Sequence, residues 1–216
     1  NTAILNRNDP DNHVAFYVDE WGTWYDVEEG TNPGFLQQKN SLRDALVAAL
    51  NFNIFHKYAE RVQMTNIAQM VNVLQAMILT EGDRMILTPT YHAFKMYVPF
   101  HGATTLALEL NEVPHYELGE CSVPTVSATA ARGLDGKIYL ALVNSDPGQA
   151  VTVSAALSGI DVTGVSGQVL SNDAMDAHNT FDAPDTVAPQ PYSASAQGGV
   201  LQLELPAKSV TVVHVH

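Results

Sequence analysis

The sequence has a single cysteine, Cys121, so no intrachain disulfide can form. A lone cysteine is typical of a reducing compartment or of an unconstrained secreted chain, and the simplest interpretation of Cys121 is a small apolar filler. Basic residues are also scarce: 10 Lys and Arg against 23 Asp and Glu give a net charge of −13. This excess of negative charge argues against nucleic acid and anionic membrane surfaces as partners. It is compatible with a neutral ligand such as a sugar.

Several patterns that would assign a reaction or a location are missing as well. No apolar run approaches the roughly 20 residues that a membrane span requires, and residues 1–11 lack the apolar centre of a signal peptide. The eight histidines are scattered; only His214 and His216 lie close together, with no third or fourth ligand evident. The sequence therefore predicts no metal and no cofactor. Because the first residue is Asn1 and not Met, we expect the chain to begin inside a longer product or after a cleavage, which leaves localisation open.

The composition changes near residue 100. Hydrophobic residues make up 46% of the sequence and charged residues 15%, which is typical of a globular protein with a core. Residues 1–100 contain both tryptophans and the clear helical patterns, whereas the remainder is rich in Val, Thr, Ser, Ala and Gly. We therefore predict two domains, an α/β part over residues 1–100 and an all-β part over residues 101–216.

The α/β part alternates strands and helices. Apolar β-forming runs predict strands, and helical spacing after the N-cap Ser41 predicts helices: strands at residues 13–18 and 61–64, helices at residues 41–58 and 68–79. Residues 28–38 are expected to be a loop, and residues 88–99, with two prolines, a crossover. Two such units are too few to close an eight-stranded barrel, so this part is interpreted as the end of a barrel whose beginning lies elsewhere.

The all-β part has short alternating runs separated by turn residues, which favours an antiparallel sandwich. The strands are predicted at residues 104–110, 125–131, 138–144, 150–156, 164–170, 200–205 and 209–214. A long loop is expected over residues 171–195.

The most informative stretch is residues 19–25, directly after the first predicted strand. It combines two acids, Asp19 and Glu20, with three aromatic side chains. Barrels of this class carry catalytic residues at the carboxyl ends of their strands. Sugar sites need carboxylates for the chemistry and aromatic faces for stacking. The alternative is that the acids are solvated loop residues and the aromatics pack the barrel.

The same stretch resembles the segment that carries the nucleophile in glycoside hydrolase family 51 α-L-arabinofuranosidases. The resemblance continues through residues 42–50, 59–79, 88–92 and 179–185. It covers essentially the whole chain, is specific up to about residue 97, and identifies the chain as similar to the C-terminal part of such an enzyme. It implies barrel strands seven and eight with their helices, followed by a jelly-roll-like β-sandwich.

The resemblance also implies a site. Glu20 matches the family's catalytic nucleophile, and Gln69 matches a glutamine that hydrogen-bonds the arabinosyl unit. Trp21, Trp24 and Asn66 are expected near the pocket. Asp19 is expected to have a structural role, because neighbouring side chains of a strand point in opposite directions.

The family's acid/base glutamate, in an Asn-Glu pair, has no counterpart here, since Asn111-Glu112 falls in the β part. The resemblance therefore predicts a retaining hydrolase that acts on arabinan, arabinoxylan or arabino-oligosaccharides. It needs an N-terminal segment or second chain for the acid/base, and is expected to form a homo-oligomer. A lone chain with open barrel edges is expected to be unstable as a monomer.

Two other interpretations stay open. The β part could be a carbohydrate-binding or structural module without catalysis, although such a module has no need for a barrel end that carries Glu20. A xylanase or endoglucanase of the same barrel superfamily would keep the reaction class and change the substrate.

Overall fold

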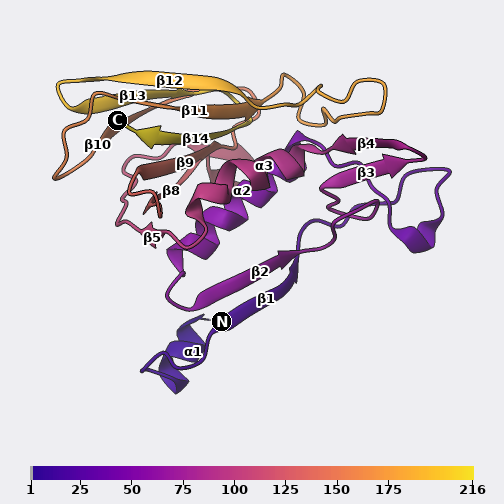
Figure 1. Ribbon diagram of the computed structural model, residues 1–216, viewed down its shortest axis with the longest axis horizontal. Coiled ribbons are helices and arrows are strands. Elements are labelled where there is room, and N and C mark those ends of the chain that lie inside the picture. Colours follow the sequence, from indigo (N-terminus) through magenta and orange to yellow (C-terminus); the bar gives the residue numbers. More distant parts are fainter. Residues whose placement is uncertain (1) are drawn as a thin grey trace.

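A pair of parallel strands, two helices and a large curled sheet lie in successive layers in the computed structural model, which describes residues 2–216 (Figure 1). The first part of the chain contains α1 (Thr2–Asn8), β1 (Phe16–Trp21), η1 (Pro33–Phe35), α2 (Leu42–Lys57), β2 (Val62–Ile67), β3 (Ile78–Glu81), β4 (Arg84–Leu87), α3 (Pro89–Tyr97) and η2 (Val98–Phe100). None of the helices between residues 2 and 216 is long and apolar enough to cross a membrane.

The predicted order of strand, loop, helix and strand is confirmed. β1 and β2 pair in parallel, with Phe16 opposite Val62 and Trp21 opposite Ile67. Between them, α2 begins after the N-cap Ser41, which forms a capping box with Asp44. One face of α2 is buried against α3 and the large sheet. The eight-stranded barrel around the β1–β2 pair stays a prediction.

The helix predicted over residues 68–79 is wrong. This segment is a series of turns that leads into the β3–β4 hairpin, and Asn72 and Gln75 have positive φ angles of 54° and 57°. Both side chains form hydrogen bonds outside the segment: Asn72 donates to the Thr80 hydroxyl, and Gln75 donates to the Thr23 carbonyl. The apolar residues of this segment recur at helical spacing, but its backbone is irregular. Side-chain hydrogen bonds to residues distant in sequence hold the turns instead.

Within residues 88–99, which the sequence predicted as a crossover, Pro89–Tyr97 form the helix α3. Thr88 accepts a hydrogen bond from the Tyr91 backbone N–H at 3.3 Å, and Pro89 occupies the first turn. Proline is favoured at the first helical position because its missing N–H would be unpaired there in any case. The first of the two prolines thus begins the helix.

The rest of the chain forms one eight-stranded antiparallel sheet and a small separate hairpin. The strands are β5 (Thr104–Thr105), β6 (His115–Leu118), β7 (Cys121–Pro124), β8 (Val126–Arg132), β9 (Ile138–Asn144), β10 (Val151–Ala156), β11 (Gly164–Ser171), β12 (Gln190–Gln197), β13 (Val200–Leu205) and β14 (Ser209–Val215). The order in the sheet is β10-β13-β12-β11-β14-β9-β8-β5, and β6 pairs with β7.

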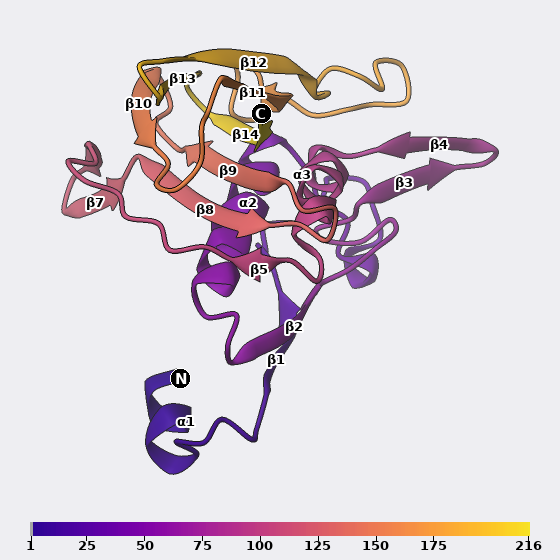
Figure 2. The ribbon, with the colours of Figure 1, turned by 60° about the vertical axis from the view of Figure 1, so that its left-hand side comes forward.

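The sheet curls into a half-barrel, and β12 makes the corner. Residues 190–195 of β12 pair with β11, whereas Ala196 and Gln197 pair with β13. Figure 2 shows β12 along the top of the sheet, with β10 and β13 at one end and β9 and β8 beneath. The two layers expected of a sandwich are thus hydrogen-bonded parts of one curled sheet.

Alternate residues of the strands supply two cores. Ala141 and Val143 of β9 face the helices and share a cluster with Leu42. Leu140 and Leu142 of the same strand face the inside of the curl. This period of two is the one expected for a sheet covered on both faces. It also joins the two predicted domains in one helix–sheet core, while the boundary at residue 100 stays a prediction.

Two predictions in the β part need correction. The strand predicted over residues 104–110 is reduced to Thr104–Thr105, and the loop predicted over residues 171–195 ends early because β12 begins at Gln190. Pro191 obscured β12, since proline within a run argues against a strand. The other six strands lie where they were predicted, to within a residue or two.

Candidate active site

Glu20 lies at the carboxyl end of β1, where the β1–β2 pairing is irregular. The register shifts between Val18 and Trp21, so Asp19 and Glu20 fall in the irregular stretch. Irregular pairing of this kind occurs beside active sites because it re-aims a side chain. The loops after the two strands leave from the same edge, where the Ala68 backbone N–H donates to the Trp21 carbonyl at 3.1 Å.

A pocket of about 500 Å³ opens at this edge. Its lining residues come from the loops after β1 and β2 and from the η1 turn: Glu20, Trp24, Gly34, Phe35, Leu36, Gln69, Asn72, Val73 and Leu74. Of the described residues that line it, Glu20 carries the one charged group. The pocket therefore combines a carboxylate, two side-chain amides and aromatic rings, which suits a neutral, hydroxyl-rich ligand.

Three of the predicted site residues line this pocket and two do not. Glu20, Gln69 and Trp24 belong to the lining, and the Trp24 side chain is 69% exposed. Trp21 instead packs into the helix layer, while Asn66 is exposed on β2 outside the lining. All five were predicted near one site, and the structure brings only Glu20, Gln69 and Trp24 together.

Trp21 belongs to an aromatic cluster. Its ring meets Phe52 at a centroid distance of 5.6 Å, Phe55 at 5.4 Å and Phe94 at 6.1 Å. These contacts tie the end of β1 to α2 and α3. Trp21 thus packs against the two helices and does not line the pocket.

The sequence did not predict the other six lining residues, among them Phe35, Asn72, Val73 and Leu74. Phe35 lies in the 28–38 loop, and Asn72, Val73 and Leu74 lie in the segment predicted as a helix. Only the expected proximity of Gln69 to the site pointed to this segment. A helix over residues 68–79 would have carried the three side chains around its axis instead of along one wall.

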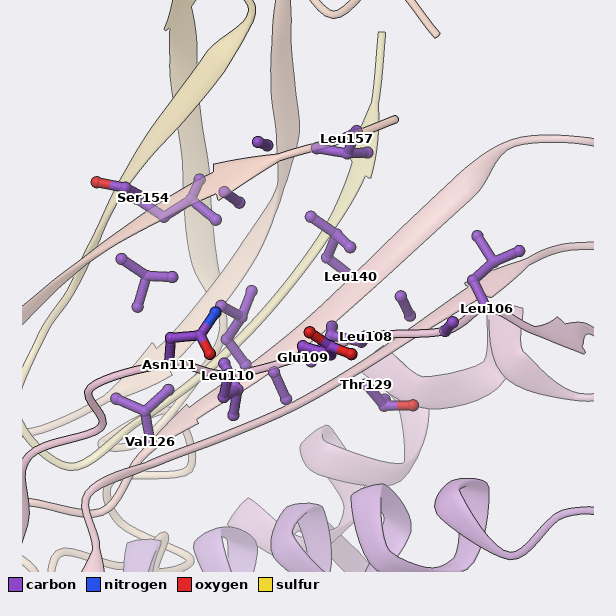
Figure 3. A pocket seen from close by; sticks show the side chains of 18 of the residues that line it. Leu106, Leu108, Glu109, Leu110, Asn111, Val126, Thr129, Leu140, Ser154 and Leu157 are labelled. Atoms are coloured by element: carbon purple, nitrogen blue, oxygen red, sulfur yellow. The ribbon is translucent and has the colours of Figure 1, made fainter. Parts of the chain in front are cut away.

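A larger cavity of about 850 Å³ lies inside the curled sheet, between residues 106–113 and strands β8, β9 and β10. Figure 3 shows the side chains of Leu106, Leu140 and Leu157 around it. Asn111 and Glu112, the Asn-Glu pair noted in the sequence, line this cavity and not the pocket of Glu20. Its lining is mainly aliphatic and, among the described residues, includes no aromatic ring for a sugar to stack on, so the smaller pocket is the better sugar site.

Within residues 2–216, no group of three or more His, Cys, Asp and Glu side chains is arranged to hold a metal ion. The pocket of Glu20 offers the chemistry of a carboxylate and two side-chain amides. A carboxylate beside an amide and an open aromatic face can attack or stabilise an electrophilic sugar carbon.

Comparison with known proteins identifies the chain. A family model, that of the α-L-arabinofuranosidase C-terminal domain, matches residues 19–209. An intracellular exo-α-L-arabinofuranosidase of Bacteroides ovatus is 41% identical over 99% of this chain and 42% of its own length. An exo-α-(1→6)-L-arabinofuranosidase of Bifidobacterium longum is 29% identical over 94% of this chain and 42% of its own.

A solved structure agrees with these sequence matches. The glycoside hydrolase family 51 arabinofuranosidase of Xanthomonas axonopodis pv. citri superposes with a TM-score of 0.97 and 51% identity, over 100% of this chain and 44% of that one. The chain thus spans less than half the length of the relatives that it matches. It belongs to the glycoside hydrolase family 51 α-L-arabinofuranosidases and corresponds to their C-terminal portion.

Proposed function

We propose that the complete protein is a retaining glycoside hydrolase that releases terminal non-reducing α-L-arabinofuranosyl residues, with Glu20 as the nucleophile. The observation that carries the proposal is the pocket in which Glu20, Gln69 and Trp24 meet at the carboxyl ends of two parallel strands. The named activity of the relatives, arabinofuranosidase, supports the substrate class. Arabinan, arabinoxylan and arabino-oligosaccharides are the proposed sources of that sugar.

The proposed reaction is a double displacement. A carboxylate oxygen of Glu20 attacks the anomeric carbon as the bond to the leaving oxygen breaks, and a second carboxyl group gives that oxygen a proton. The same second group then takes a proton from water, whose oxygen displaces Glu20. Retaining enzymes hold the two carboxyl groups about 5–5.5 Å apart, so the partner must approach the open side of the pocket.

The remaining parts of the proposal concern the rest of the protein. We assign residues 1–100 to the end of the catalytic barrel and residues 101–216 to a β domain. The acid/base is supplied by a segment or chain outside these 216 residues, and the complete enzyme forms a homo-oligomer. Gln69 binds a hydroxyl of the arabinosyl unit, and Trp24 stacks on its apolar face. Trp21 and Asn66 lie near this site but do not line the pocket.

The test is Glu20→Gln in the complete protein, with Glu29→Gln as a matched control on an exposed loop acid. With an aryl α-L-arabinofuranoside, we expect Glu20→Gln to lower kcat by at least about 10³-fold and the control to leave it unchanged. Glu20→Ala with added azide should regain turnover and form the inverted arabinofuranosyl azide, because azide replaces the missing carboxylate on the same face. Undiminished turnover in Glu20→Gln would remove Glu20 from the nucleophile role.

The same assay decides between the alternatives. A binding or structural module would bind arabino-oligosaccharides without turnover, and Glu20→Gln would then change nothing measurable in catalysis. A related endo-glycanase would shorten xylan or glucan chains internally and leave terminal arabinofuranosyl groups in place.

A further inference from the structure

The loop that follows Glu20 is tied down by side chains from three distant segments. The Thr23 hydroxyl donates to Oδ1 of Asp44 at 2.8 Å. Its carbonyl accepts from Nε2 of Gln38 at 3.3 Å and from Nε2 of Gln75 at 3.2 Å. The Tyr25 backbone N–H donates to Oε1 of Gln38 at 3.0 Å. The stretch between Glu20 and Trp24 is therefore held at its midpoint.

Asp44 is the centre of this arrangement. Its side chain is fully buried in the first turn of α2. Oδ2 accepts from the backbone N–H and the hydroxyl of Ser41, at 2.8 and 3.1 Å, which completes the helix cap, and from the Arg43 guanidinium of the same helix at 3.4 Å. Oδ1 is directed elsewhere and accepts from Thr23 and, at 3.1 Å, from Gln75. Capping of the helix uses only Oδ2, so Oδ1 is available to bind the loops of the pocket.

Gln75 carries the contact to the other side of the pocket. It is 1% exposed, and its Nε2 also contacts the Thr23 hydroxyl. It directly follows Leu74, whose carbonyl accepts from the Gln69 backbone N–H at 2.7 Å. Fixing Gln75 therefore fixes the turn that presents Gln69.

The packing at this point leaves no room for adjustment. A Cβ atom on Gly22 would lie 2.5 Å from Cγ of Gln75, and Gly22 has a φ of 145°. Both the close approach and the backbone angle therefore require glycine. The loop after β1 and the turn after β2 are thus in contact at Gly22 and Gln75, and Asp44 hydrogen-bonds both segments.

We propose that Asp44 is a positioning residue that sets Glu20 and Gln69 relative to each other across the pocket, acting through Thr23 and Gln75. A buried carboxylate is costly unless donors surround it, and here one oxygen serves the helix while the other serves the two loops of the site. This inference rests on the proposed function, because it assigns Asp44 to the same reaction as Glu20.

The experiment separates the two halves of the carboxylate in the complete protein. Thr23→Val removes the hydroxyl toward the loops and keeps the shape, Thr23→Ser restores it, and Ser41→Ala removes the hydroxyl toward the cap. We expect Thr23→Val to lower kcat on an aryl α-L-arabinofuranoside by about 10²-fold, the loss typical of a small misplacement of reacting groups. KM should change far less, Thr23→Ser should regain most of kcat, and Ser41→Ala should lower the melting temperature while kcat stays near the parent value.

A double-mutant comparison protects the result against misfolding of any one variant. Asp44→Asn keeps the shape but turns an acceptor into a donor, and adding Thr23→Val to it should cost little further kcat if the two act together. Parental kcat in Thr23→Val, or equal losses of kcat in Thr23→Val and Ser41→Ala, would overturn the inference. If Glu20→Gln is inactive in that case, only the role of Asp44 fails; if Glu20→Gln is active, the proposed function fails first.

Discussion

His56 makes the stability of the helix layer dependent on pH. It lies in the last turn of α2, stacked on Phe100 at a centroid distance of 5.0 Å and an interplanar angle of 21°. Its Nδ1 is buried with no hydrogen-bond partner in the described part of the chain. Burial, helped by the charge of the nearby His101, lowers the pKa of His56 from 6.5 to about 4.

Whether acid stabilises or destabilises the fold depends on which state, folded or unfolded, binds the proton of His56 more readily. The unfolded chain protonates His56 near pH 6.5, whereas the folded protein resists until about pH 4, so acid favours unfolding. The contribution of His56 is fully present above pH 6.5 and is lost as the pH falls through this window toward the folded pKa. The whole difference corresponds to roughly 3 kcal/mol, of which about 2 kcal/mol is lost by about pH 5.

His56→Phe removes the titration and keeps a ring against Phe100. Urea unfolding of the complete protein, followed by circular dichroism at about pH 7.5 and about pH 5, gives the loss of unfolding free energy on acidification. This loss should be smaller in His56→Phe than in the parent by about 2 kcal/mol. His115→Gln, an exposed histidine of β6, should behave as the parent. An equal loss in His56→Phe and the parent would refute the assignment of pH sensitivity to His56.

Four further predictions concern aromatic residues and the strand edges. Trp24→Ala should raise KM several-fold with little change in melting temperature, as expected for an exposed stacking ring. Trp21→Ala should cost about 3–5 kcal/mol of unfolding free energy, because it leaves a cavity in the aromatic cluster. Tyr97→Phe should cost about 1–3 kcal/mol, since the Tyr97 hydroxyl donates to Oδ1 of buried Asn53 at 2.9 Å; no loss in urea unfolding would contradict this. The isolated 216-residue chain should associate in sedimentation experiments, because β1 and β2 pair only with each other within residues 2–216. A monomeric, cooperatively folding chain would argue against the barrel interpretation.

Structural features that depend on residues close together in the sequence could be predicted from it. The helix after Ser41 follows from a cap, a first-turn acid and apolar spacing, all within a few residues, and it is present as Leu42–Lys57. The strands at residues 138–144 and 200–205 follow from alternation and turn residues in the same way. The family resemblance rested on contiguous motifs and is confirmed.

The two tryptophans show where such reasoning stops. Trp21 and Trp24 are the same residue type three positions apart, yet one packs among phenylalanines of two helices and the other lines the pocket. Nothing in their local sequence separates them. The irregular pairing at the end of β1 and the turn at Gly22 decide which ring points inward.

By itself, the sequence determined the N-cap and extent of α2, most strands of the large sheet, the strand-end position of Glu20 and the family, because these depend on residues close along the chain. Only the tertiary structure decided that residues 68–77 are turns that lead into β3, that β12 makes the corner of the sheet, and that Asp44 hydrogen-bonds both loops of the pocket. Each of these depends on partners far apart in sequence, such as Gln75 with Thr23 and Asp44. The free energy of such contacts outweighs local preference, and sequence spacing carries no record of them.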